Sequence, residues 1–224
     1  MRDLSQDSSP LENYLHMLYP TEPNALFEEA REASRELGKA PISLSPHEAR
    51  LMSTLIQMQG CKKFVEIGTL TGLSALWILQ GLSEGGELWT LEKDERHAKA
   101  ARLIFEKYSE KNKDKKIHLI EGDAQKTLAS LSQQGPFDGV FIDGNKSAYE
   151  TYLDWAEKNV KKGGLILADN VFLGGAVLTG NKATFSKKQI DVMKSFNERL
   201  ADPKRYKGCI VPTGEGLFVA IKLF

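Results

Sequence analysis

Two short runs near the middle of the chain contain the side chains that could do chemistry together. The first run is Asp143-Gly-Asn-Lys146, and the second is Asp169-Asn170. Two carboxylates and one amide oxygen form an all-oxygen set of ligands, which suits Mg²⁺, Mn²⁺ or Ca²⁺ and suits zinc or copper poorly. Lys146 adds an amine beside the same site. A divalent cation next to a potential base indicates chemistry on an oxygen nucleophile.

The elements that must position these residues are two strands. The mostly apolar stretch 137–142 precedes Asp143, and the stretch 164–168 precedes Asp169. In a parallel α/β sheet, ligands bind in the crevice beyond the carboxyl ends of the strands. Both runs are therefore predicted to lie in that crevice, close to each other.

The order of the predicted elements defines the fold class. Strands are predicted at 63–67, 87–92, 116–121, 137–142 and 164–168, with helices between them, including 74–82 and 94–107. Such alternation is typical of parallel strands joined by right-handed helical crossovers. The last two predicted strands, 208–212 and 217–222, are four residues apart and must form an antiparallel hairpin. We therefore expect an α/β fold with a Rossmann-like, doubly wound sheet of seven mostly parallel strands that ends in this hairpin.

The first 60 residues are predicted to be helical. Helices are expected at 11–18, at 26–37 and from Pro46 to about 59, the last with Ser45 as its N-cap. No linker divides the chain, so we expect one domain over 1–224, with the N-terminal helices 1–60 contributing to the active site. The segment 171–188, rich in Gly and Thr, follows Asp169-Asn170 directly and is expected to be a mobile loop.

Composition narrows the choice of partners. Lys plus Arg and Asp plus Glu both total 30, and this balance argues against a nucleic-acid partner. The two cysteines, Cys61 and Cys209, are expected to be core thiols of a cytoplasmic protein. No apolar run approaches the roughly 18 residues of a membrane span, and the polar N-terminus lacks a signal peptide. We therefore expect a soluble, cytoplasmic protein with no membrane partner.

A second cluster of polar residues is predicted at the ends of the first three strands. The first strand runs into a turn with Gly68 and Gly72, where a ligand can approach the backbone closely. Glu66 lies at the end of an apolar strand, and a cationic ligand group would account for an acid at this position. Glu92 ends the second strand, where an acid can bind both ribose hydroxyls of a nucleoside. Asp123 and Ala124 follow the third strand, well placed for an adenine edge.

The residues by themselves are compatible with three functions. A nicotinamide-dependent dehydrogenase would share the α/β order and the acid after the second strand, but the turn reads G-x-x-x-G and not G-x-G-x-x-G. A non-catalytic nucleoside-binding module would need Glu66 and Glu92, but neither Lys146 nor the paired metal residues. The third function is catalysis on an oxygen nucleophile, with a bound nucleoside cofactor and a cation.

Taken together, these residues resemble the cation-dependent class I O-methyltransferases, the group that contains the catechol and caffeoyl-CoA O-methyltransferases. The similarity covers nearly the whole chain. It is carried by the segments 19–23, 42–46, 65–76 and 137–146 and by Ala168-Asp-Asn170, which occur in the family's order. The resemblance implies S-adenosylmethionine as the methyl donor, a divalent cation, a small phenolic acceptor such as a vicinal diphenol, and a homodimer.

The resemblance also implies a role for each matching residue. Glu66, Gly68, Thr69 and Ser74 would hold the methionine part of the cofactor, with Leu44 and Asp143 also in contact with it. Glu92 would bind the ribose hydroxyls, and Asp123 and Ala124 would flank the adenine. Asp143, Asp169 and Asn170 would ligate Mg²⁺, or else Mn²⁺ or Ca²⁺. Lys146 would be the base that takes the phenolic proton.

Five further residues are given no part in this assignment. The catechol enzymes carry another acid, after the Asp-Asn pair, that contacts the second substrate hydroxyl; Glu198 and Arg199 lie in the approximate region, and no role is transferred to them. His97 is expected to be solvated and Trp155 to lie in the core. Tyr149, just after the lysine, is a candidate for facing the substrate.

Overall fold

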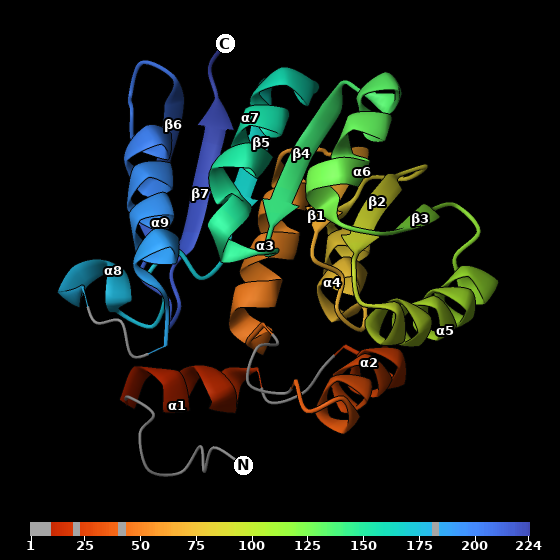
Figure 1. Cartoon of the computed structure of the whole chain (residues 1–224). Coiled ribbons are helices and arrows are strands. Elements are labelled where there is room, and N and C mark those ends of the chain that lie inside the picture. Colours follow the sequence, from red (N-terminus) through yellow and green to blue (C-terminus); the bar gives the residue numbers. More distant parts are fainter. Residues whose placement is uncertain (1–9, 20–22, 40–43, 181–183) are drawn as a thin grey trace.

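The computed structural model describes residues 10–19, 23–39, 44–180 and 184–224 (Figure 1). The strands are β1 (Lys63–Ile67), β2 (Glu87–Glu92), β3 (Lys116–Glu121), β4 (Phe137–Ile142), β5 (Val160–Ala168), β6 (Tyr206–Val211) and β7 (Leu217–Lys222). The helices are α1 (Pro10–Leu18), α2 (Ala25–Glu36), α3 (Pro46–Met58), α4 (Leu73–Gly81), α5 (Glu95–Lys111), α6 (Ala124–Leu131), α7 (Tyr149–Asn159), α8 (Ala176–Thr179) and α9 (Lys187–Leu200). Among the described residues, none of these helices is both long enough and apolar enough to span a membrane.

The seven strands form one sheet in the order β3-β2-β1-β4-β5-β7-β6. The five strands from β3 to β5 are parallel, whereas β7 runs antiparallel to both β5 and β6. This arrangement confirms the predicted doubly wound sheet with a C-terminal hairpin. The strand order reverses between β1 and β4, and such a switch point is where open α/β sheets bind their ligands.

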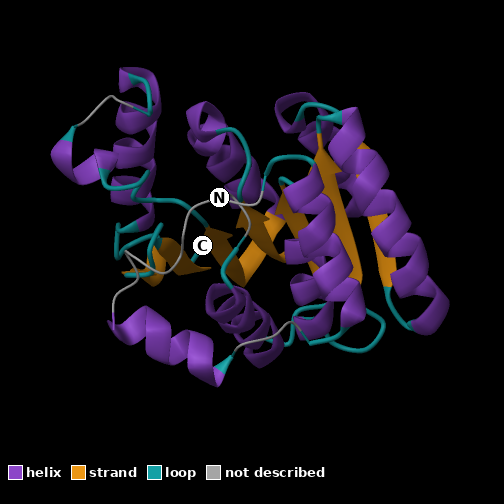
Figure 2. Ribbon diagram, turned by 90° about the horizontal axis from the view of Figure 1, so that it is seen from below, coloured by secondary structure: helices purple, strands orange, loops and turns teal. Residues whose placement is uncertain are grey.

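Helices cover both faces of the sheet, because the strand side chains alternate between two apolar layers. Val65 and Ile67 of β1 pack in the layer formed with α6, α7 and α9. Phe64 of the same strand packs in the opposite layer, with α2, α3, α4 and α5. Figure 2 shows the two helical layers on either side of the sheet. Trp155 of α7 is buried, as predicted.

Several details differ from the sequence-based predictions. Strand β5 begins at Val160 rather than 164, because Val160 already pairs with Phe137 before a bulge restores the register at Leu165. The segment 171–188 contains helix α8 and the first two residues of α9. Cys61 is buried as expected, but Cys209 is exposed on the edge strand β6, so its prediction as a core thiol was wrong.

Candidate functional site

A cavity of about 450 Å³ lies at the carboxyl ends of the parallel strands, around the switch point. This volume falls in the usual range of small-molecule sites. The predicted site residues that line it are Leu44, Gly68, Glu92, Asp123, Ala124, Asp143, Lys146, Asp169 and Asn170. Thr69 and Ser74 line a smaller hollow that shares Leu44, Gly68 and Asp143 with the cavity. The strand ends of both halves of the sheet therefore converge on one space.

Gly68 allows the end of β1 to touch the end of β4. Its φ angle is +106°, and a Cβ atom at this position would lie 2.4 Å from the backbone oxygen of Asp143. No side chain fits in so short a distance. The turn after β1 and the first predicted metal residue are therefore held in backbone contact.

Glu66 lies completely buried behind this turn. One carboxylate oxygen, Oε2, accepts a 2.5 Å hydrogen bond from the Thr90 hydroxyl, and the other has no hydrogen-bond partner among the described residues. Burial raises the pKa of Glu66 to about 8, against the opposing effect of the hydroxyls of Ser74 and Thr90. A buried carboxylate with a free oxygen fits a cationic ligand group, such as an amine.

Glu92 is held in place by two backbone amides. Its Oε2 accepts from the amide of Leu70 at 2.8 Å, and its Oε1 accepts from the amide of Asp94 at 2.9 Å. His97 Nδ1 lies 3.6 Å from the same Oε1, and the imidazole is buried against the cavity. The prediction of a solvated His97 was therefore wrong, because the first turn of α5 packs against the end of β2.

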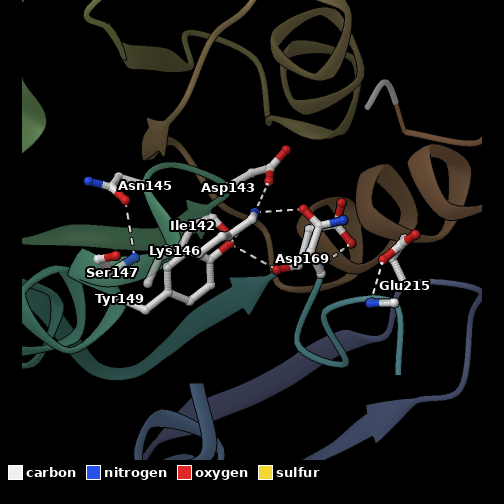
Figure 3. Close-up of polar contacts among 10 residues, drawn as sticks. Ile142, Asp143, Asn145, Lys146, Ser147, Tyr149, Asp169 and Glu215 are labelled. Atoms are coloured by element: carbon white, nitrogen blue, oxygen red, sulfur yellow. Dashed lines mark hydrogen bonds and ion pairs between the residues drawn. The ribbon is translucent and has the colours of Figure 1, made fainter. Parts of the chain in front are cut away.

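Asp143, Lys146 and Asn170 form a compact polar cluster, and Figure 3 shows Lys146 pointing toward Asp143. The Lys146 ammonium donates to Asp143 Oδ1 at 2.7 Å, to Asn170 Oδ1 at 2.6 Å and to the Tyr149 hydroxyl at 2.7 Å. Asn170 has a φ angle of +57°, an uncommon backbone conformation that asparagine tolerates better than most residues. The predicted amine and two of the three predicted metal ligands are thus brought together.

Tyr149 supports this cluster from behind. Its hydroxyl accepts from Lys146 and donates to the backbone oxygen of Asp169 at 2.9 Å. The side chain is fully buried and does not line the cavity, so it does not face a substrate. Burial holds the pKa of Tyr149 well above its usual value, which keeps the hydroxyl available as a donor.

Asp169 is the third of the residues predicted to ligate a cation. It is 5% exposed, and its Oδ1 accepts from the amide of Asn170 at 2.7 Å. Burial holds the pKa of Asp169 well above the usual carboxylate range, and the charges of Asp143 and Glu48 raise it further. Lys146 opposes this effect. The carboxylates around Asp169 therefore repel one another in a setting that a divalent cation would relieve.

Other residues at the cavity were not predicted from the sequence. Glu48 of α3, Phe185 before α9 and Glu215 in the β6–β7 turn all line it. Glu215 Oε2 accepts from the amide of Gly174 at 3.2 Å, which ties this turn to the segment after Asn170 (Figure 3). The S-x-x-E pattern at Ser45 to Glu48 reads as a simple helix start, and a four-residue hairpin turn carries no chemical signature. Only the tertiary fold assigns these two acids to the cavity.

The two residues near the expected sequence position of the additional acid do not line the cavity. Glu198 is exposed on α9. Arg199 forms ion pairs with Asp154 at 2.6 Å and with Glu157 at 2.7 Å, on the outer side of the layer formed by α7 and α9.

Comparisons with known proteins identify the family of the chain. A family model described as O-methyltransferase matches residues 19–223. A catechol O-methyltransferase from Niastella koreensis is 35% identical over 192 residues, which cover 85% of this chain and 84% of that protein. An O-methyltransferase from Bacillus cereus, solved in complex with SAH, superposes with a TM-score of 0.83 at 28% identity, over 95% of this chain and 96% of that one.

A second similar solved structure contains the methyl donor. An O-methyltransferase from Streptomyces achromogenes, in complex with SAM, has a TM-score of 0.81 at 25% identity, with 96% of each chain covered. None of these matches supports a dehydrogenase or a non-catalytic nucleoside-binding module. The chain therefore belongs to the O-methyltransferase family of the catechol and caffeoyl-CoA type, and it is an S-adenosylmethionine-dependent enzyme.

Proposed function

We propose that this enzyme transfers a methyl group from S-adenosylmethionine to one hydroxyl of a small vicinal diphenol, with a bound divalent cation. The observation that carries the proposal is the convergence of Asp143, Asp169, Asn170 and Lys146 in one cavity. The same cavity extends to Glu92 and Asp123 at the ends of the neighbouring strands. A cofactor and an acceptor can therefore bind side by side.

The cofactor would bind along the carboxyl ends of strands β1 to β3. Glu66, Gly68, Thr69, Ser74, Leu44 and Asp143 would surround the methionine part, Glu92 would bind the ribose, and Asp123 and Ala124 would flank the adenine. The free oxygen of Glu66 fits the amino group of the cofactor. The two backbone amides that hold Glu92 would keep its carboxylate oriented for two hydroxyl groups.

The cation would bind to Asp143, Asp169 and Asn170. Two carboxylates and an amide oxygen match the preference of Mg²⁺ and Mn²⁺ for oxygen ligands, and Ca²⁺ has the same preference. The bound cation would lower the pKa of a coordinated hydroxyl and orient the oxygen pair of a diphenol. The mutual repulsion of the acids around Asp169 supports this assignment.

Lys146 would remove the proton from the reacting hydroxyl. A phenol with a pKa of about 10 is mostly protonated at neutral pH and needs a base. As a neutral amine, Lys146 would accept this proton at Nζ while the phenolic oxygen forms a bond to the methyl carbon and the sulfur–carbon bond breaks. Tyr149, Asp143 and Asn170 fix the position of Nζ. Positioning of the two reactants would supply much of the remaining acceleration.

The acceptor would enter on the side of α3, the β6–β7 turn and Phe185. Phe185 is half-buried and offers an apolar surface to an aromatic ring. Glu215 is the acid placed to accept a hydrogen bond from the second hydroxyl. We further propose that residues 1–224 act as one catalytic domain, with its N-terminal helices supplying part of this wall. The homodimer expected from the resemblance stays a prediction.

A turnover assay tests the proposal. With S-adenosylmethionine and Mg²⁺, catechol should be methylated and phenol should not. Lys146→Met should reduce the rate with catechol by orders of magnitude and spare cofactor binding, whereas Lys158→Met, at an exposed position on α7, should be neutral. The loss should shrink with a nitro-substituted catechol, which arrives already ionised. An equal loss with both acceptors would contradict the role of Lys146 as the base.

A further inference from the structure

Glu48 of helix α3 lines the cavity, and one of its carboxylate oxygens takes no part in capping the helix. Ser45 and Glu48 form a capping box at the start of α3. Within this box, Glu48 Oε2 accepts from both the amide of Ser45, at 3.2 Å, and the Ser45 hydroxyl. Glu48 Oε1 is buried and has no hydrogen-bond partner among the described residues.

A second capping box in the same chain shows that a neutral side chain can close such a box. At the start of α9, Ser186 is paired with Gln189, and the amide oxygen of Gln189 accepts from the Ser186 backbone and hydroxyl, each at 2.9 Å. A neutral amide therefore closes the box as well as a carboxylate. A buried carboxylate costs free energy unless its charge is compensated, so the acid at position 48 calls for another explanation.

The location of Glu48 supplies that explanation. Its side chain lines the cavity together with Asp143, Asp169 and Asn170, and it enters from the opposite side of the sheet to α7. No three Asp, Glu, His or Cys side chains in the described parts of the chain form a cluster that could hold a metal ion, so we assign Glu48 no direct bond to the cation. Mg²⁺ usually keeps several of its waters when it is bound by two carboxylates.

We propose that Glu48 is a positioning residue of the cation site, whose free Oε1 accepts a hydrogen bond from a water molecule on the bound cation. The inference rests on the proposed function, since it requires a cation at Asp143, Asp169 and Asn170. Glu48 would orient that water and add a negative charge near the ion. Groups of this kind outside the ligand set typically change metal affinity by about 10-fold or more.

Direct measurement of Mn²⁺ binding tests the inference without the use of activity. The metal-stripped full chain is titrated with Mn²⁺, and free Mn²⁺ is followed by electron paramagnetic resonance. Glu48→Gln keeps an acceptor in the capping box and removes the charge, so it should fold normally and bind Mn²⁺ about 10-fold more weakly. Gln189→Glu, the matched exchange in the exposed box of α9, should bind as wild type does. Glu48→Asp, which keeps the charge on a shorter side chain, should lose less than Glu48→Gln.

The outcomes separate this inference from the function on which it rests. Wild-type Mn²⁺ affinity in Glu48→Gln, with thermal unfolding also unchanged, would overturn the role of Glu48 alone. The same would follow if Mn²⁺ affinity were unchanged and the KM for catechol rose, because Glu48 would then contact the acceptor. If the wild type bound Mn²⁺ no better than Asp143→Asn does, the cation site itself would be refuted.

Discussion

At the scale of single residues, Glu92 is the group on which recognition of the nucleoside depends. The two backbone amides that hold it leave its carboxylate able to accept further hydrogen bonds from hydroxyls. Glu92→Ala should weaken S-adenosylmethionine binding by about 1–3 kcal/mol, the range for hydrogen bonds to a charged group. Calorimetry measures this loss, and Glu95→Ala, at an exposed position on α5, is the control. Unchanged affinity in Glu92→Ala would remove Glu92 from the cofactor site, and wild-type protein should show no measurable binding of NAD.

Glu66 makes the stability of the cofactor-free protein depend on pH. Its pKa is about 8 in the folded chain, against 4.5 for an unperturbed glutamate. Between these values the folded state holds a proton that the unfolded state has lost, so stability should fall as pH rises, by up to about 1.4 kcal/mol per pH unit. Below 4.5 and above 8 this contribution should be constant.

The variant Glu66→Gln isolates this effect, because Asp169 and all other groups titrate in both proteins. Urea unfolding of the two proteins at pH 5.5 and pH 8.5 gives the difference in free energy of unfolding. Glu66→Gln should gain relative to wild type at the higher pH. A difference that does not change with pH would show that Glu66 is ionised in the folded chain.

At the scale of elements, the contact between the turn after β1 and the end of β4 holds the two halves of the site together. Gly68→Ala would place a methyl group 2.4 Å from the Asp143 backbone oxygen, whereas Gly85→Ala, at φ +71°, meets nothing within 4 Å. Both variants carry the cost of a positive φ angle. Gly68→Ala should therefore lose about 1–3 kcal/mol of stability beyond Gly85→Ala, and cofactor affinity as well. Equal losses in urea unfolding would mean that the close approach is unimportant.

The bounds of the strands and helices show how much of the fold can be predicted from the sequence. Strands β1 to β4 and β7 have the bounds predicted from their apolar runs, because each run ends abruptly at glycine or at charged residues. Strand β5 begins early because Val160 pairs across a bulge, and periodicity gives no sign of this pairing. Helix α8 is a single turn between Gly175 and Gly180, which is too short for an amphipathic pattern to reveal.

At the scale of the whole molecule, the cavity joins residues that lie far apart in the sequence. Residues that directly follow strands, such as Asp143 and Asp169, could be placed there from the sequence, because parallel strands deliver their ends to one edge. Glu48, His97 and Glu215 could not, since a helix start, a charged helix and a hairpin turn reach the cavity only through packing of separate elements. The local pattern around each of these three residues already has a structural explanation.

Methyl transfer by this enzyme is expected to depend on a divalent cation held at the ends of β4 and β5. The most direct test is the rate of methyl transfer from S-adenosylmethionine to catechol in EDTA, measured before and after addition of excess Mg²⁺. The rate should fall to background in EDTA and return with Mg²⁺. In Asp143→Ala, which removes one ligand at a strand end, it should stay at background in both conditions while the protein remains folded. Full activity of the wild type in EDTA would contradict the account.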